Sequence, residues 1–168
     1  PGQQGGPHMH TIAAKAVAFK EAMGRDFRDY QEQVLDNARV MAKVLQERGY
    51  RIVSGRTECH LFLVDLRAKG LTGKDGEALL SAVGITCNKN GVPFDPLPPM
   101  KTSGIRVGSP AGTTRGFGAQ EFRDIGNWIS DVLEGLARNG EDGNRAVEAE
   151  VRDKVRELCG RFPIYPRS

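Results

Sequence analysis

The sequence has few cysteines, and they are too far apart to form a disulfide framework or a zinc site. Cys59, Cys87 and Cys159 form no CxxC pair and no metal-type cluster with the three histidines. No N-x-S/T glycosylation sequon occurs either. We therefore expect free thiols in a reducing compartment and a cytoplasmic protein.

Long hydrophobic runs and blocks of one charge are also absent. No apolar stretch is long enough to cross a bilayer, and no signal-peptide pattern opens the chain. The 24 basic and 21 acidic residues are interspersed and leave a net charge of only +3. Although the pI of 8.9 is basic, this balance argues against a nucleic-acid-binding protein. We expect neither a membrane nor a nucleic acid as a partner.

The hydrophobic periodicity predicts helices separated by a short β-rich region. Helices are expected over residues 7–23, 26–48, 71–84, 118–138 and 143–158, and strands over residues 50–54, 60–66, 85–88 and 105–109. Thr72 and Asp75 have the spacing of a capping box, and Gly49 is a candidate left-handed helix cap. Residues 92–100 contain four prolines and can form neither a helix nor a central strand.

This order predicts an α/β protein of the α+β kind, with a small mixed or antiparallel sheet and helices on one face. The two predicted helices before residue 49 have no strands of their own. We therefore divide the chain into residues 1–48, a remnant of another domain, and residues 49–168, a small domain. The chain starts at Pro1 without an initiator Met, and we interpret this start as a cut within a loop.

Three features of the sequence are candidate binding elements. Gly5 and Gly6 precede a helix, where free backbone N–H groups can hold a phosphate, although an ordinary Gly-rich segment is the more frequent meaning. Arg106 lies within an apolar strand and suits a carboxylate, or else an internal salt bridge or an exposed edge position. Asn90 and the stiff loop after it could hold a flat ligand or simply connect two strands.

No residues form a recognisable catalytic arrangement. The sequence has no persuasive Ser/His/Asp set, metal cluster or carboxylate pair, and none of its eight lysines lies in a recognisable Schiff-base context.

Three motifs taken together resemble one enzyme family. PGQQGGPHMHTIAAKAVAFKEA, HLFLVDL with LTGKDGEALL and GITCNKNGVPFDP, and TSGIRVGSPAGTTRGF have the order and spacing of the C-terminal portion of serine hydroxymethyltransferase. The final CGRFPIYP is similar to the family's closing segment. The resemblance therefore extends over the whole chain.

The resemblance implies a fold type I, aspartate-aminotransferase-like pyridoxal 5'-phosphate (PLP) enzyme. Such enzymes interconvert serine and glycine with tetrahydrofolate as co-substrate, as homodimers or tetramers. By this resemblance, Gly5 and Gly6 contact the PLP phosphate of a neighbouring subunit, and Arg106 pairs with the amino-acid carboxylate. Folate contacts are implied for Asn90, Pro98, Pro99 and Met100. Many members have Ser-Pro-Phe where this chain has Pro-Pro-Met, so backbone contacts are implied there rather than the same side-chain contacts.

The family's PLP-binding lysine, in a Thr-Thr-His-Lys-type motif, does not occur in these 168 residues. We therefore expect the chain alone to be inactive, although the parent protein is an enzyme. The alternative is a free-standing, non-catalytic module that binds a carboxylate or a folate-like ligand, or that dimerises with a longer relative.

Overall fold

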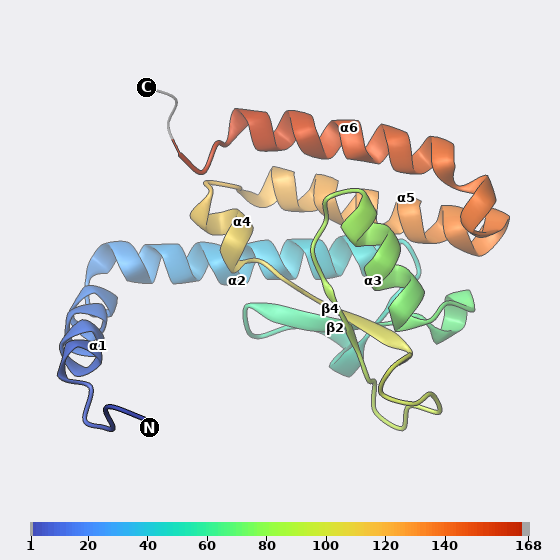
Figure 1. Ribbon diagram of the computed structural model, residues 1–168. Coiled ribbons are helices and arrows are strands. Elements are labelled where there is room, and N and C mark those ends of the chain that lie inside the picture. Colours follow the sequence, from blue (N-terminus) through green and yellow to red (C-terminus); the bar gives the residue numbers. More distant parts are fainter. Residues whose placement is uncertain (1, 166–168) are drawn as a thin grey trace.

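The computed structural model describes residues 2–165, except for the side chains of residues 141–143 (Figure 1). The helices are α1 (Met9–Ala22), α2 (Arg25–Glu47), α3 (Gly73–Ala82), α4 (Pro110–Thr114), α5 (Ala119–Gly143) and α6 (Arg145–Arg161), and the strands are β1 (Arg51–Ile52), β2 (Leu61–Asp65), β3 (Asn88–Asn90) and β4 (Gly104–Gly108). Two 3-10 turns, η1 (Val53–Gly55) and η2 (Arg67–Lys69), flank β2. The mixed α/β composition agrees with the expected fold class.

The four strands form one small antiparallel sheet in the order β1-β2-β4-β3. Strand β4 pairs with β2 along its whole length and with β3 on its other side, so β4 is an interior strand. Its residues Ile105 and Val107 are 0% and 5% exposed and point into the core, as does Val64 of β2. Because successive side chains of a strand alternate between faces, the residues between them point to the opposite face.

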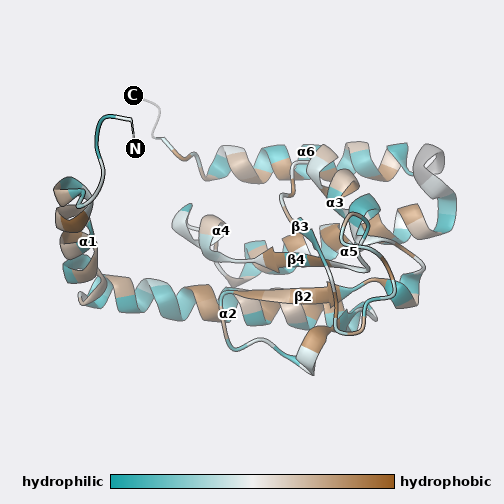
Figure 2. Cartoon of the chain, turned by 60° about the horizontal axis from the view of Figure 1, so that its bottom comes forward, coloured by the Kyte–Doolittle hydropathy of each residue, from teal (hydrophilic) through white to brown (hydrophobic). Residues whose placement is uncertain are grey.

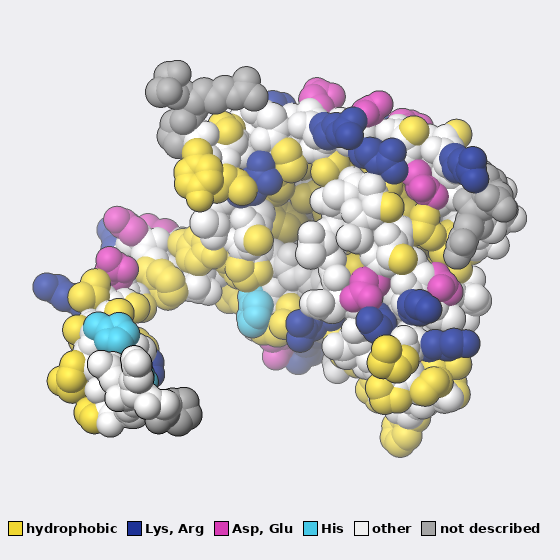
Figure 3. Space-filling view, in the orientation of Figure 1, with side chains coloured by type: hydrophobic (Ala, Val, Ile, Leu, Met, Phe, Trp, Pro, Cys, Tyr) yellow, Lys and Arg dark blue, Asp and Glu magenta, His cyan; other side chains and the backbone are white. Residues whose placement is uncertain are grey.

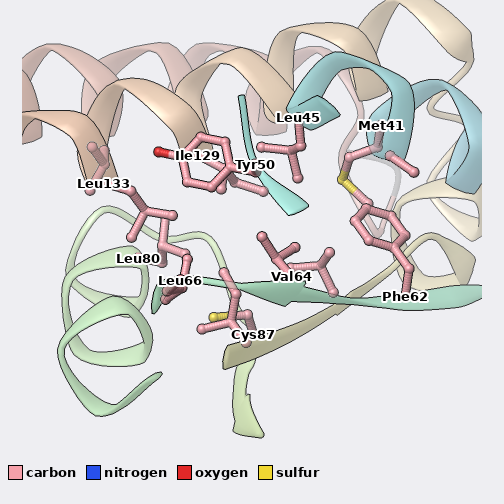
Figure 4. Close-up of a cluster of buried hydrophobic side chains, with 14 of the residues drawn as sticks. Met41, Leu45, Tyr50, Phe62, Val64, Leu66, Leu80, Cys87, Ile129 and Leu133 are labelled. Atoms are coloured by element: carbon pink, nitrogen blue, oxygen red, sulfur yellow. The ribbon is translucent and has the colours of Figure 1, made fainter. Parts of the chain in front are cut away.

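All the covering helices pack on the inner face of this sheet, as predicted. Helices α2 and α5 contribute Met41, Leu45, Ile129 and Leu133 to the core, against Phe62 and Val64 of β2 (Figure 4). Helix α3 adds Leu80, and α6 adds Val151 and Leu158. No helix of the described part of the chain covers the outer face, and Leu61 and Leu63 remain half-buried there.

Local signals in the sequence account for several element boundaries. The hydroxyl of Thr72 accepts a hydrogen bond from the Asp75 backbone N–H (3.2 Å) and donates one to Asp75 Oδ2 (2.6 Å), which fixes the start of α3. Gly49 has φ +81°, as expected for a left-handed cap. The strand expected over residues 85–88 was placed wrongly. The observed strand is Asn88–Asn90, because this polar edge strand is defined by its pairing with β4.

Helix α1 projects from the end of α2, away from the sheet (Figures 1 and 2). It has no buried residue, and Met9, Val17 and Phe19 are 58–69% exposed. Figure 3 shows hydrophobic side chains gathered on this projection. The division at residue 48 stays a prediction, and the second half of α2 belongs to the core of the following segment. Among residues 2–165, no helix combines the length and hydrophobicity that a membrane span requires.

The packing of α5 against the start of α6 requires a glycine at residue 135. A Cβ there would collide with the side-chain oxygen of Asn144, which is fully buried and donates from Nδ2 to the Val132 carbonyl (3.1 Å). We expect Gly135→Ala to lower the free energy of unfolding by about 2 kcal/mol through overpacking. Urea denaturation measures this loss. Gly160→Ala is the matched control, because a Cβ at Gly160 meets no atom within 4 Å and should stabilise α6 by at most about 1 kcal/mol. Equal effects of the two substitutions would contradict the steric explanation.

Candidate functional site

Arg106 lies on the outer face of the sheet because its neighbours Ile105 and Val107 are buried on the inner face. It is paired with Leu63 of β2 and Asn88 of β3 in the strand register. Its Nη2 donates to Asn88 Oδ1 at 3.1 Å, and the side chain is exposed. The strand is not at an edge, and Arg106 forms no ion pair with any residue that the structure describes. Its charge is therefore available to an anion from outside.

The other charged groups along this face are already paired. Asp65, 4% exposed, accepts hydrogen bonds from Arg67 Nε (3.0 Å) and Nη2 (2.7 Å), and Arg51 Nη1 lies 3.5 Å from Asp65 Oδ2. The hydrogen bonds from Arg67 lower the pKa of Asp65 despite its burial. Asp65 therefore remains charged and paired with arginines other than Arg106.

Asn88 and Asn90 lie on the same face as Arg106, whereas Lys89 between them points toward α3. Lys89 Nζ pairs with Glu77 Oε2 at 3.0 Å, and the Lys89 backbone N–H donates to Glu77 Oε1 at 3.0 Å. Asn90 is half-buried and donates from Nδ2 to the Gly91 carbonyl at 2.8 Å. The alternation thus places a guanidinium and two side-chain amides together on one side of the sheet.

The proline-rich segment that follows Asn90 forms an ordered connection from β3 to β4, without helix or strand. Pro98, Pro99 and Met100 are exposed at its surface, Met100 by 75%. The Pro98 carbonyl accepts hydrogen bonds from the backbone N–H groups of Lys101 (2.9 Å) and Thr102 (3.0 Å). Backbone and side-chain groups of this stretch are thus accessible next to the Asn90 end of β3.

Asp95 organises this connection through both carboxylate oxygens. Oδ1 accepts from the Ser103 hydroxyl (2.6 Å) and the Leu97 backbone N–H (3.0 Å), and Oδ2 accepts from the backbone N–H groups of Ser103 (2.8 Å) and Val92 (3.1 Å). These bonds, chiefly the one from the Ser103 hydroxyl, lower the pKa of Asp95 far below its ordinary value. The sequence reasoning did not identify Asp95 or Asn88. The Asp-Pro turn signal could have indicated Asp95, and the antiparallel pairing with Arg106 identifies Asn88.

Gly5 and Gly6 lie in the segment before α1, away from the sheet that carries Arg106 (Figure 1). Both are exposed, and a Cβ at either position would meet no atom within 4 Å. Their backbone N–H groups form no hydrogen bond with any described residue. The chain therefore brings Arg106, Asn90 and the proline-rich segment together, and leaves the two glycines separate with free donors.

The remaining candidate sites are metal sites and apolar clefts. Among the described side chains, those of residues 2–140 and 144–165, no group of three or more His, Cys, Asp or Glu could hold a metal ion. An apolar cleft of about 200 Å³ lies between α4, α5 and α6, on the helical side of the sheet. At its border Arg115 donates to the carbonyls of Cys159 and Phe162, a structural role at the end of α6.

Comparison with known proteins decides the family. The family model of serine hydroxymethyltransferase matches residues 1–129. A serine hydroxymethyltransferase from Rhizorhabdus wittichii is 63% identical over 166 residues, which are 99% of this chain and 38% of the relative. Those from Jannaschia sp. and Paracoccus denitrificans are each 62% identical, over 99% and 98% of this chain. The chain belongs to the serine hydroxymethyltransferase family.

Membership in this family confirms the resemblance seen in the motifs, and the chain matches only part of each relative. The chain spans 38–39% of the length of these relatives, and it corresponds to their C-terminal part. The roles of Gly5, Gly6, Arg106, Asn90 and residues 98–100 stay predictions.

The depressed pKa of Asp95 predicts how acid affects the proline-rich segment. A carboxyl with a lower pKa in the folded state contributes stability that is complete above its unfolded pKa, about 3.9, and that is lost as the pH falls through the folded value. We expect Asp95→Asn to be less stable than the unsubstituted chain at pH 7, and this difference to shrink below about pH 4. Urea denaturation at pH 7, 5 and 3 measures it. Asp153→Asn, at an exposed helical ion pair, serves as the control, and a difference for Asp95→Asn that is constant with pH would contradict the assignment.

Proposed function

We propose that this chain is the C-terminal part of an active serine hydroxymethyltransferase and that it holds the amino-acid substrate and tetrahydrofolate. The observation that carries the proposal is the exposed guanidinium of Arg106, which has a neutral partner in Asn88 (3.1 Å) and no carboxylate partner among the described residues. In a member of this family, such a group is suited to bind the carboxylate of serine or glycine through two parallel hydrogen bonds.

The folate would lie at the Asn90 end of the same sheet face. Asn90 offers an amide for the polar edge of a heterocycle, and Pro98, Pro99 and Met100 offer an exposed surface with two adjacent, locally stiff prolines. Asn90 is the last residue of β3, residues 98–100 belong to the segment that connects β3 to β4, and Arg106 of β4 is opposite Asn88. Amino acid and folate would therefore bind to one continuous surface, as a one-carbon transfer between them requires.

PLP would act as the electron sink for the amino acid, and this chain would contribute to holding its phosphate. The exposed N–H groups of Gly5 and Gly6 have no partner among residues 2–165, which suits an anion. Because these glycines lie apart from Arg106 (Figure 1), we assign them to the PLP phosphate of a neighbouring subunit. The proposed assembly is accordingly a homodimer or a tetramer.

A chimaera tests this proposal. The C-terminal part of the Rhizorhabdus wittichii relative is replaced with these residues, and serine-to-glycine conversion is measured with tetrahydrofolate. We expect an active chimaera, and we expect Arg106→Ala to raise the KM for serine about 100-fold, since two charge-assisted hydrogen bonds are lost. Arg106→Lys should recover part of this loss, because it restores the charge but not the planar fork.

Arg123→Ala is the matched control. Arg123 is exposed on α5, away from the outer face of the sheet, and its side chain forms no ion pair with the described residues. Its substitution should leave the KM for serine unchanged. An Arg106→Ala chimaera with an unchanged KM for serine would overturn the assignment.

We further expect the 168 residues alone to be inactive, because none of their lysines lies in the family's PLP-binding motif. After incubation with PLP and reduction with borohydride, peptide mapping should reveal no single lysine modified in stoichiometric amount. One fully modified lysine, together with turnover of serine, would contradict this expectation. The active chimaera provides the positive control.

A further inference from the structure

The segment that connects β3 and β4, residues 91–103, has few backbone N–H donors with which to form regular structure. Four of its residues are prolines, which have no backbone N–H, so the segment cannot order itself as a strand or helix. Phe94 has φ +57°, an unfavourable backbone conformation for a bulky residue, and its side chain is 99% exposed. The order of this segment must therefore come from other groups.

The end of the segment nearest β4 is held by the main chain. The carbonyls of Lys101, Thr102 and Ser103 accept hydrogen bonds from the backbone N–H groups of Lys74, Gly73 and Leu66, each at 2.9 Å. These bonds fix the last residues against α3 and the end of β2. The exposed part of the segment, residues 93–100, carries the proposed folate surface. Within it, the main chain joins Pro98 to the anchored end, because the Pro98 carbonyl accepts from the N–H groups of Lys101 and Thr102. The three carbonyl bonds of residues 101–103 do not reach residues 93–97.

Asp95 links the exposed part to this fixed end. Its carboxylate joins Val92 and Leu97, on either side of it, to both the backbone N–H and the hydroxyl of Ser103, at 2.6–3.1 Å. Ser103 is itself fixed, with 1% exposure. Among the described residues, these are the side-chain hydrogen bonds that connect residues 92–97 to the anchored end.

We infer that Asp95 and Ser103 form a clasp that positions Pro98, Pro99 and Met100 for folate, and thereby sets folate affinity without contacting the folate. This inference rests on the proposed function. Asp95 is a positioning residue: removing it frees the exposed part of the segment, while Arg106, held by the β2–β4 and β3–β4 pairing, keeps its place. A purely structural role would instead affect both substrates alike.

The kinetic test uses the chimaera with four variants: Asp95→Ala, Ser103→Ala, the double alanine variant and Asp95→Asn. We expect Asp95→Ala to raise the KM for tetrahydrofolate about tenfold, while the KM for serine changes less than about twofold, since hydrogen bonds of a charged group are lost only in the segment. Ser103→Ala removes one of the four bonds and should have a smaller effect. The double variant should resemble Asp95→Ala alone, because the serine hydroxyl has then lost its partner. Asp95→Asn, which keeps the size and one acceptor oxygen, should restore part of the folate affinity.

The outcomes separate the inference from the proposed function. An unsubstituted chimaera without folate-dependent turnover would overturn the proposed function. An active chimaera in which Asp95→Ala leaves the KM for tetrahydrofolate unchanged, or raises both KM values equally, would overturn the clasp alone.

Amide hydrogen exchange on the 168-residue chain tests the clasp independently of activity. In Asp95→Ala, the amides of Val92, Leu97 and Ser103 should exchange faster, whereas those of Gly73 and Lys74, which donate to the anchored end, should keep their rates. Equal acceleration of both groups would indicate general destabilisation and would overturn the local role of Asp95.

Discussion

The burial of Ile105 and Val107 against the helical layer is the constraint on which the rest of the site depends. Both side chains belong to the core that α2 and α5 complete. Because side chains alternate along a strand, the side chain of Arg106 must then point to the outer face of the sheet. Antiparallel pairing places Asn88 opposite it. Apolar packing on the inner side of the sheet therefore supplies the free energy that holds the Arg106 guanidinium on the exposed outer side. The hydrophobic core and the charged surface are two faces of one five-residue strand.

The same sheet supports a second, differently built surface. Arg106 is fixed by regular strand pairing, whereas residues 91–103 depend on individual hydrogen bonds because prolines prevent a backbone ladder. A carboxylate suits this task, since it accepts several N–H and O–H groups at once and prefers to remain charged when it does so. The two surfaces can thus respond separately to substitution. The position of Arg106 depends on strand pairing, whereas the positions of residues 92–97 depend on the hydrogen bonds of the Asp95 carboxylate.

The sequence was informative where structure follows from local pattern. The capping pair Thr72 and Asp75, the cap at Gly49 and the strand around Val64 could all be predicted, because each depends on residues near in sequence or on simple alternation. Strand β3 was placed wrongly, because Asn88, Lys89 and Asn90 carry no hydrophobic signal and form a strand through β4. The helix at Pro110–Thr114 was missed for a similar reason: Ser109 anchors its start by donating to the Val34 carbonyl (2.6 Å), far away in sequence. The partners of Asp95 likewise become visible only after folding.

Helix α1 differs from these elements, because its sequence favours a helix with apolar residues but the helix packs against little of the chain. Its alanines favour a helix, yet apolar residues occupy several sides and none is buried. A helix that is apolar around its circumference is normally enclosed by protein, and a projecting apolar surface of this kind is typical of an interaction site. Gly5 and Gly6 are connected to α1 by Pro7 and His8 alone. A surface that enclosed α1 would therefore also lie close to these two glycines.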